Sequence, residues 1–142
     1  WWAGQALFGH LTWTTALLTL AYSLSGLGIA VINDFKSVEG DKSLGLESLP
    51  VVFGIKNASR ISAGMIDIFQ LAMVIVLIAI GQHFASVILV LLIIPQITFQ
   101  DIWLLRDPLS FDVKYQASAQ PFLILGMLVT AIAIGHSSLI SL

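Results

Sequence analysis

The chain has 142 residues, of which 58% are hydrophobic and only 10% are charged, and its mean hydropathy is +0.97. An average soluble domain is about half apolar and about a quarter charged. This excess of apolar residues excludes an ordinary water-soluble domain and indicates that most side chains face lipid. The net charge of −2, without any basic stripe, excludes nucleic acid as a partner. Because the chain has no cysteine, it contains no disulfide and no thiolate metal site.

Four segments are long and apolar enough to cross about 30 Å of hydrocarbon as helices, which takes about 20 residues each. They cover approximately residues 9–33, 58–81, 84–105 and 117–140. In the last of these, Pro121 falls in the first helical turn, where a proline is tolerated. The sequence therefore predicts an all-α fold, a polytopic transmembrane helix bundle that forms one domain in a lipid bilayer.

The basic residues all lie in or beside two of the connections, the one after the first span and the one after the third. They are Lys36, Lys42, Lys56, Arg60, Arg106 and Lys114. Alternating helices place both connections on one side of the membrane, and the positive-inside rule makes that side cytoplasmic, or stromal in a plastid. We expect any chemistry on this charged side.

The connection at residues 34–56 begins with an unusual density of acidic residues. If the chain continues as a helix, Asp34, Ser37 and Asp41 lie at positions i, i+3 and i+7, on one face. Mg²⁺ prefers oxygen ligands and is usually held by one or two carboxylates together with substrate phosphates. The spacing thus predicts that Asp34 and Asp41 hold a divalent metal.

Two lysines in the same connection could neutralise a bound diphosphate. Lys42 follows the second carboxylate directly, and Lys36 is a second candidate. Each would act as a point charge toward a phosphate oxygen. The competing interpretation is that this connection is merely solvated and orients the protein in the membrane.

Ionisable and amide side chains also fall inside or beside the predicted spans, where they are costly unless functional or paired. Two interpretations of these residues remain open: they line a polar cavity, or they extend toward the interface. The residues 106–116 are predicted either to clamp this cavity or to form a simple helix–helix turn. The cavity candidates are Asp67, Gln70, Gln100, Asp101, Lys114 and Tyr115.

Three runs of the sequence resemble the chlorophyll synthase branch of the UbiA-type intramembrane prenyltransferases. The first run, NDFKSVEGD at residues 33–41 followed by GLESLPVVFG at 45–54, is similar to the second aspartate-rich motif of that family. The runs WWAGQALFG at 1–9 and DVKYQASAQPFL at 112–123 also look like it. Many relatives carry Asp where this chain has Ser37, which leaves Asp34 and Asp41 as the main metal ligands and Glu39 as a reserve.

This resemblance implies the C-terminal part of a bundle of about nine spans, of which four are present. It implies a prenyltransferase that esterifies the propionate of chlorophyllide with geranylgeranyl or phytyl diphosphate, with Mg²⁺ as cofactor, in a thylakoid or other photosynthetic membrane. The first aspartate-rich motif of the family does not occur in these 142 residues. We therefore expect the fragment alone to be inactive.

Two other functions remain as alternatives. A different member of the superfamily would prenylate an aromatic ring such as homogentisate. A pigment-binding membrane subunit without catalysis would use a histidine as an axial ligand to a tetrapyrrole magnesium. The candidates for that ligand are His10, His83 and His136, which are predicted near the face opposite the carboxylates.

Overall fold

The computed structural model describes Ala3, Leu7 and residues 12–140, without the side chains of Thr14 and residues 136–140. The predicted start of the first span at residue 9, and His10, lie outside the described residues. The same is true of the side chain of His136.

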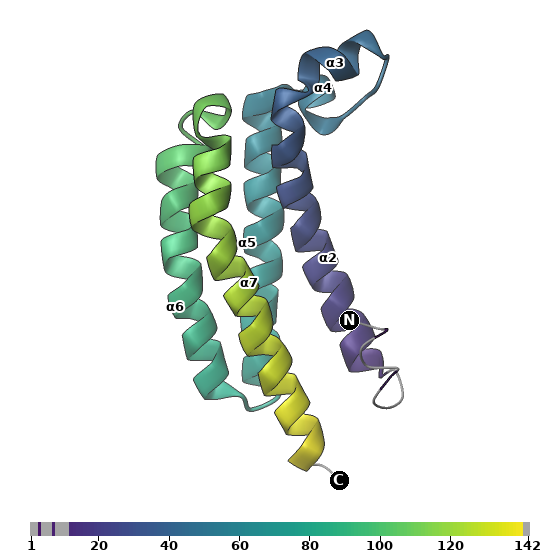
Figure 1. Cartoon of the computed structure of the whole chain (residues 1–142). Helices are drawn as coiled ribbons and strands as arrows, with labels where there is room; N and C mark the ends of the chain where they lie inside the picture. The colour runs from purple at the N-terminus through teal and green to yellow at the C-terminus, as the bar shows by residue number, and fades with distance from the viewer. Residues whose placement is uncertain (1–2, 4–6, 8–11, 141–142) are drawn as a thin grey trace.

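Four helices are long and apolar enough to cross a membrane, and they lie side by side (Figure 1). They are α2 (Trp13–Asn33), α5 (Ile55–Ala79), α6 (His83–Phe99), which the π-helical segment η2 (Gln100–Leu104) extends, and α7 (Pro108–Ile140). No strand occurs among the described residues. The predicted all-α bundle of membrane-spanning helices is confirmed.

The long helices pack in two pairs, α2 along α5 and α6 along α7, and α5 also contacts α6 and α7. Helix α7 begins beside α6 and tilts across the bundle toward α2 at the other end (Figure 1). There the Tyr22 hydroxyl lies 2.7 Å from the Thr130 hydroxyl and donates to the Gly126 carbonyl oxygen at 3.2 Å. A polar contact thus joins the first and last described spans inside the bundle.

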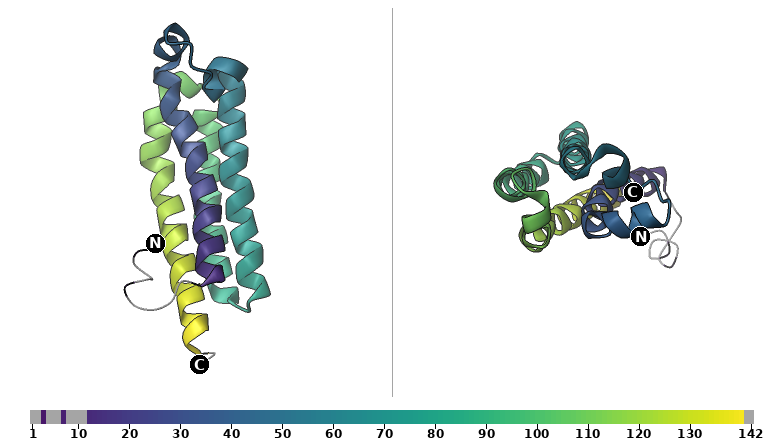
Figure 2. Two further views of the ribbon diagram at one scale, coloured as in Figure 1. Left: turned by 90° about the vertical axis from the view of Figure 1, so that its right-hand side faces the viewer. Right: turned by 90° about the horizontal axis from the view of Figure 1, so that it is seen from above.

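The short helical segments between α2 and α5 lie at one end of the bundle, as the side and top views show (Figure 2). The 3₁₀ turn η1 (Asp34–Lys36) follows α2 directly, and α3 (Val38–Ser43) and α4 (Leu49–Phe53) complete the connection to α5. The predicted connection is therefore largely helical. Gly54 adopts a φ of 77°, a conformation that favours glycine, so α4 can end and α5 begin within a single residue.

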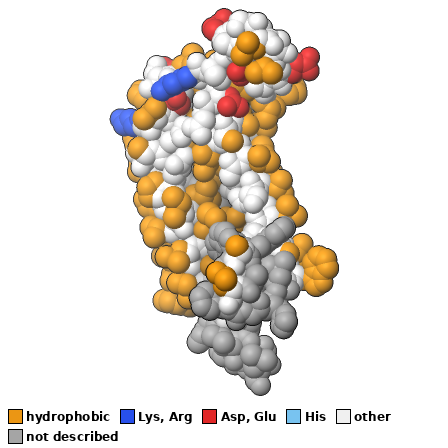
Figure 3. Space-filling model, turned by 45° about the vertical axis from the view of Figure 1, so that its right-hand side comes forward, with side chains coloured by type: hydrophobic (Ala, Val, Ile, Leu, Met, Phe, Trp, Pro, Cys, Tyr) orange, Lys and Arg blue, Asp and Glu red, His pale blue; other side chains and the backbone are white. Residues whose placement is uncertain are grey.

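The charged side chains gather at this same end, whereas the flank of the bundle is apolar (Figure 3). This separation is what a lipid slab demands, because an ionised side chain at the centre of a bilayer costs at least about 2.5 kcal/mol. The two predicted basic connections therefore lie together on one end. His83 begins α6 at the opposite end, where its side chain is exposed.

The interior contains two apolar clusters separated by polar side chains. The cluster near the charged end includes Ile32, Phe35 and Leu104, and the distant cluster includes Leu77 and Leu89. The buried polar residues at intermediate height are Ser25, Gln70, Gln96 and Gln100. A polar layer therefore crosses the middle of the bundle, at a depth where polar groups depend on protein partners.

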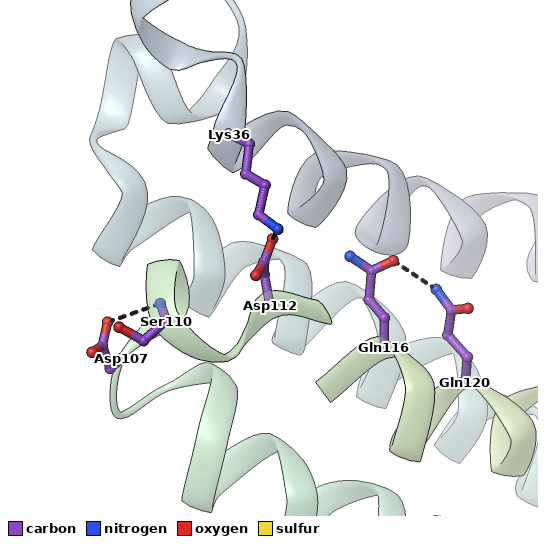
Figure 4. A network of polar contacts seen from close by, with 6 residues as sticks. All are labelled: Lys36, Asp107, Ser110, Asp112, Gln116 and Gln120. Carbon is purple, nitrogen blue, oxygen red and sulfur yellow. Dashed lines mark hydrogen bonds and ion pairs between the residues drawn. The ribbon is translucent and has the colours of Figure 1, made fainter. Parts of the chain in front are cut away.

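The last helix begins nine residues earlier than the sequence predicts, so the predicted boundary at residue 117 is wrong. Pro108 takes the first position of α7, and the backbone N–H of Ser110 donates to Asp107 Oδ1 at 3.3 Å, as in a helix cap (Figure 4). Pro121 consequently lies inside α7 rather than in its first turn. Because polar and charged residues alternate with apolar ones between Pro108 and residue 117, hydropathy alone assigned this stretch to a loop.

The close approach of α2 and α5 depends on Gly28. A Cβ at this position would lie 2.8 Å from the Ser62 carbonyl oxygen, which belongs to the backbone and cannot move aside easily. Gly26 faces open space, with no heavy atom within 4 Å of such a Cβ. The two glycines thus differ in packing although both lie in the same helix.

We predict that Gly28→Ala destabilises the protein and that Gly26→Ala does not. Both substitutions gain about 1 kcal/mol of helix propensity, but Gly28→Ala adds an overpacking cost of about 1–3 kcal/mol. Thermal unfolding of the purified protein in detergent measures the difference. Equal unfolding midpoints for the two variants would contradict the close contact.

Asp107 gives a second prediction, because it lies outside the membrane-spanning segments. The Ser110 hydroxyl and backbone N–H donate to its carboxylate and lower its pKa from the ordinary value of 3.8. A lowered pKa in the folded state contributes stability above the ordinary pKa, and this contribution disappears as the pH falls through the lowered value. We expect Asp107→Ala to lower the unfolding temperature by a constant amount from about pH 5 to 8, and by less below pH 3.8. Asp107→Asn is the companion variant: it also removes the titrating carboxylate, so its difference from the wild type should shrink over the same pH range.

Candidate metal and diphosphate site

Ser37 contacts both residues that the sequence predicts as metal ligands, Asp34 through its backbone carbonyl and Asp41 through its carboxylate. The Asp34 carbonyl oxygen accepts from the Ser37 backbone N–H at 3.1 Å, and the Ser37 hydroxyl lies 3.0 Å from that oxygen and 3.3 Å from Asp41 Oδ2. Ser37 itself has a helical backbone, with φ of −95° and ψ of −1°. The chain therefore continues from η1 into α3 without reversing direction, and the positions of Asp34 and Asp41 depend on each other.

A second hydroxyl fixes Asp41 from the other side of the connection. Ser48 Oγ donates to Asp41 Oδ2 at 2.7 Å. Both hydroxyls approach the same carboxylate oxygen, so Oδ1 has no partner among these serines. Outer hydrogen bonds of this kind orient metal-binding carboxylates in many proteins. Asp41 is thus held in one orientation with an oxygen left over for a ligand.

The donor set fits a hard cation that shares its coordination with a substrate. Among the described residues, no three His, Cys, Asp or Glu side chains converge on a common point. Glu39 is paired with Lys42 instead, at 3.3 Å, and its side chain is 89% exposed. Asp34 and Asp41 remain, both half-buried. Two carboxylates are the number that Mg²⁺ usually takes from a protein when phosphate oxygens and water supply the rest.

The two lysines of the connection have different partners. Lys42 Nζ lies 3.3 Å from Glu39 Oε1, and both side chains are more than half exposed. Exposed pairs of this kind contribute about 1 kcal/mol or less, so Lys42 can exchange Glu39 for a phosphate oxygen at little cost. Lys36 Nζ instead lies 3.2 Å from Asp112 Oδ2, on α7. Of the two lysines, Lys42 is the one available to a ligand.

Three of the predicted cavity residues meet inside the bundle. Gln100 Nε2 donates to Asp67 Oδ2 at 2.6 Å, and the Tyr115 hydroxyl donates to Gln100 Oε1 at 3.2 Å. This chain of hydrogen bonds joins α5, η2 and α7. Because Gly28 packs against Ile66, Asp67 lies about 9 Å below Asp34 along the axis of α2, at about 1.5 Å per residue. We call these three residues the buried polar triad.

The other cavity candidates lie apart from the triad. Gln70 follows Asp67 by one turn, is 1% exposed, and has no hydrogen-bond partner within the described chain. Asp101 is exposed. Lys114 is exposed as well, and its ammonium lies 4.6 Å from the centre of the Trp103 ring, a cation–π contact. The structure thus brings together Asp67, Gln100 and Tyr115 and separates Asp101 and Lys114 from them.

Three residues that the sequence did not single out take part in these arrangements. Ser48 anchors Asp41, Asp112 pairs with Lys36, and Gln96 lies buried one turn before Gln100 without a partner in the described part of the chain. The sequence does contain a pattern that includes Asp112: Gln116 and Gln120 follow it at i+4 and i+8, so the three polar residues lie on one face of α7. Gln120 Nε2 donates to Gln116 Oε1 at 3.1 Å (Figure 4).

The buried polar triad predicts a large stability loss for Gln100→Leu. The substitution leaves Asp67 Oδ2 and the Tyr115 hydroxyl without partners, and each buried orphaned group costs about 1–3 kcal/mol. Gln116→Leu is the matched control, because the only hydrogen bond of Gln116 described here is to Gln120 on its own helix. Thermal unfolding in detergent compares the two. A loss no larger for Gln100→Leu than for Gln116→Leu would show that the triad does not hold the helices together.

Comparison with known proteins places the chain in one family. Residues 1–115 match the model of the UbiA prenyltransferase family. Over 136 residues, the chain is 60% identical to "Chlorophyll synthase, chloroplastic" of Arabidopsis thaliana, an alignment that covers 96% of this chain and 35% of that protein. It is 34% identical to "Bacteriochlorophyll synthase 34 kDa chain" of Chloroflexus aurantiacus, covering 94% of this chain and 43% of that protein.

A more distant relative has a different name. "Digeranylgeranylglyceryl phosphate synthase" of Pyrococcus furiosus is 31% identical over 93 residues, covering 64% of this chain and 32% of that protein. No solved structure matches the chain. The chain spans about a third of the length of the plant relatives that it matches. Because the family model covers most of its length, the chain belongs to the UbiA prenyltransferase family.

Proposed function

We propose that the full-length protein transfers a geranylgeranyl or phytyl group from its diphosphate to the propionate of chlorophyllide. The observation that carries this proposal is the occurrence of two acidic residues, Asp34 and Asp41, both contacted by Ser37, in one short helical stretch at the charged end of an apolar helix bundle. Identity of 54–60% with plant proteins named chlorophyll synthase supports the choice of reaction. The proposed setting is a thylakoid or other photosynthetic membrane, with the charged end on the stromal or cytoplasmic side.

Asp34 and Asp41 would hold Mg²⁺, which neutralises the charge of the diphosphate when it is bound. Ser37 and Ser48 keep the Asp41 carboxylate in one orientation, so little reorganisation is needed when the substrate arrives. Lys42 leaves its exposed partner Glu39 and donates to a diphosphate oxygen. The role of these residues is to bind the leaving group and to stabilise the charge that develops on it.

The reaction needs no proton transfer from the protein. The bond between C1 of the prenyl chain and the diphosphate oxygen breaks, and diphosphate leaves with the electron pair. A propionate oxygen of chlorophyllide, already ionised at neutral pH, then forms the new bond to C1. Because a carboxylate is a weak nucleophile, the protein must favour departure of the diphosphate and exclude water from the allylic cation.

The apolar surfaces suit the rest of the prenyl substrate. Large hydrophobic side chains are exposed along the spans, for example Leu27 on α2 and Ile124 on α7. A prenyl diphosphate has one highly charged end and a long apolar tail. The charged end of the bundle and its apolar flank match these two parts, so the substrate would bind with its tail in the direction of the helices.

Removing either carboxylate should abolish most of the transfer. In full-length protein we expect Asp34→Ala and Asp41→Ala each to lower kcat at least about 10²-fold, the scale reported for loss of one group that stabilises a developing anion. Glu47→Ala is the matched control, because Glu47 is exposed in the same connection and takes no part in the site. Ester formation from chlorophyllide measures the effect. Undiminished activity of both Asp variants would eliminate the proposed metal site.

The acceptor is tested with the same wild-type protein. Chlorophyllide and homogentisate are supplied separately, each with geranylgeranyl diphosphate and Mg²⁺, and the products are separated by chromatography. The proposal predicts a prenyl ester of chlorophyllide. Product from homogentisate alone would instead assign the protein to the aromatic-ring prenyltransferases.

A further inference from the structure

An ion pair fastens the carboxylate-bearing turn to the last helix. Lys36, the final residue of η1, contacts Asp112 in the second turn of α7, with 3.2 Å between Nζ and Oδ2 (Figure 4). The side chain of Asp112 is only 5% exposed, whereas that of Lys36 is 58% exposed. The lysine therefore reaches from the surface of the connection to a carboxylate buried beneath it.

The burial of Asp112 sets this pair apart from an ordinary surface pair. Removing one partner of a buried ion pair leaves an uncompensated charge, so the remaining group favours keeping its partner. The side chain of Lys36 is consequently committed to Asp112, in contrast to Lys42 with its exposed partner. This argues against the prediction from sequence that Lys36 binds the diphosphate.

A second anchor acts on the same turn. Phe35 is 2% exposed and belongs to the apolar cluster that includes Ile32, Leu104 and Tyr115. One residue of η1 is thus held by apolar packing and the next by an ion pair. Asp34 directly precedes Phe35 and Lys36, and its carbonyl oxygen accepts a hydrogen bond from the backbone N–H of Ser37. The Ser37 hydroxyl in turn contacts Asp41 Oδ2. Movement of the turn would displace both carboxylates.

We infer that Asp112 is a positioning residue that acts through Lys36 to hold Asp34 and Asp41 in the arrangement that binds the divalent cation. The inference rests on the proposed function of these two carboxylates. It assigns Lys36 to the protein framework and not to the diphosphate. It also gives a role in the site to α7, which lies far from the carboxylates in sequence.

The test uses full-length protein and three variants of the pair: Lys36→Met, Asp112→Asn, and the exchange of Lys36→Asp with Asp112→Lys. Binding of Mn²⁺, a hard cation that accepts similar ligands, is followed by electron paramagnetic resonance with inorganic diphosphate present. We expect each single variant to weaken Mn²⁺ binding about 10-fold or more, the scale of outer-ligand loss, and the exchange to recover most of it. Lys56→Met is the matched control, because it removes an exposed lysine from the same end of the bundle.

Kinetics distinguish positioning from direct binding. The single variants should require more Mg²⁺ for half-maximal activity, while the KM for the acceptor stays unchanged. A higher KM for the prenyl diphosphate with unchanged Mn²⁺ binding, and no recovery in the exchange, would overturn the inference and make Lys36 a diphosphate ligand. If Asp112→Asn does not fold, Asp112→Glu replaces it, because it keeps the charge and moves the carboxylate by one methylene.

Failure of this inference can be told apart from failure of the proposed function. Wild-type protein that binds Mn²⁺ with diphosphate but forms no chlorophyllide ester would refute the proposed reaction and leave the role of Asp112 measurable by resonance. Variants with wild-type Mn²⁺ binding and normal ester formation would refute the role of Asp112 and leave the reaction standing.

Discussion

Polar atoms inside hydrocarbon have no water to bond, so each must find a partner within the protein or lie at an end of the bundle. This constraint arranges the described chain. Of the fourteen Asp, Glu, Lys and Arg side chains, all but Asp67 lie at or near one end of the four spans. Asp67 lies deeper and is joined to Gln100 and Tyr115 from two other helical segments. Gln100 thus links helical segments within the interior polar layer, whereas Ser25, Gln70 and Gln96 have no side-chain hydrogen-bond partner in the described part of the chain.

The candidate site is built on this division. Its two carboxylates belong to a turn that continues an apolar helix, so the bundle below determines where the turn begins. Phe35 packs into the apolar cluster and Lys36 contacts α7. Ser48, the residue directly before α4, donates to Asp41. Three separate parts of the chain therefore fix a site whose ligands are only seven positions apart in sequence. This rigidity is in keeping with the proposed binding of a charged leaving group, which favours a site that does not reorganise.

Hydropathy predicted the four spans because lipid imposes a long, uniform apolar signal that needs no tertiary information. The same signal missed the start of α7, since Asp112 and Gln116 are polar yet helical. The helical course of the chain from Asp34 to Asp41 was predictable because helical spacing is local. The contacts of Ser48 and Asp112 could not be predicted in this way. The Ser48 contact depends on the path of the chain through Gly45, with its φ of 70°. The Asp112 contact depends on the placement of α7 against η1. Local periodicity contains no information on either.

The pairing of Lys36 with Asp112 also has a consequence for biosynthesis. The ribosome releases α2 before α7, so the turn after α2 emerges without its ionic partner Asp112. The contact between Lys36 and Asp112 can form only after α7 has been synthesised. A nascent chain halted before that point would carry Asp34 and Asp41 without the ionic contact that α7 supplies to the turn between them.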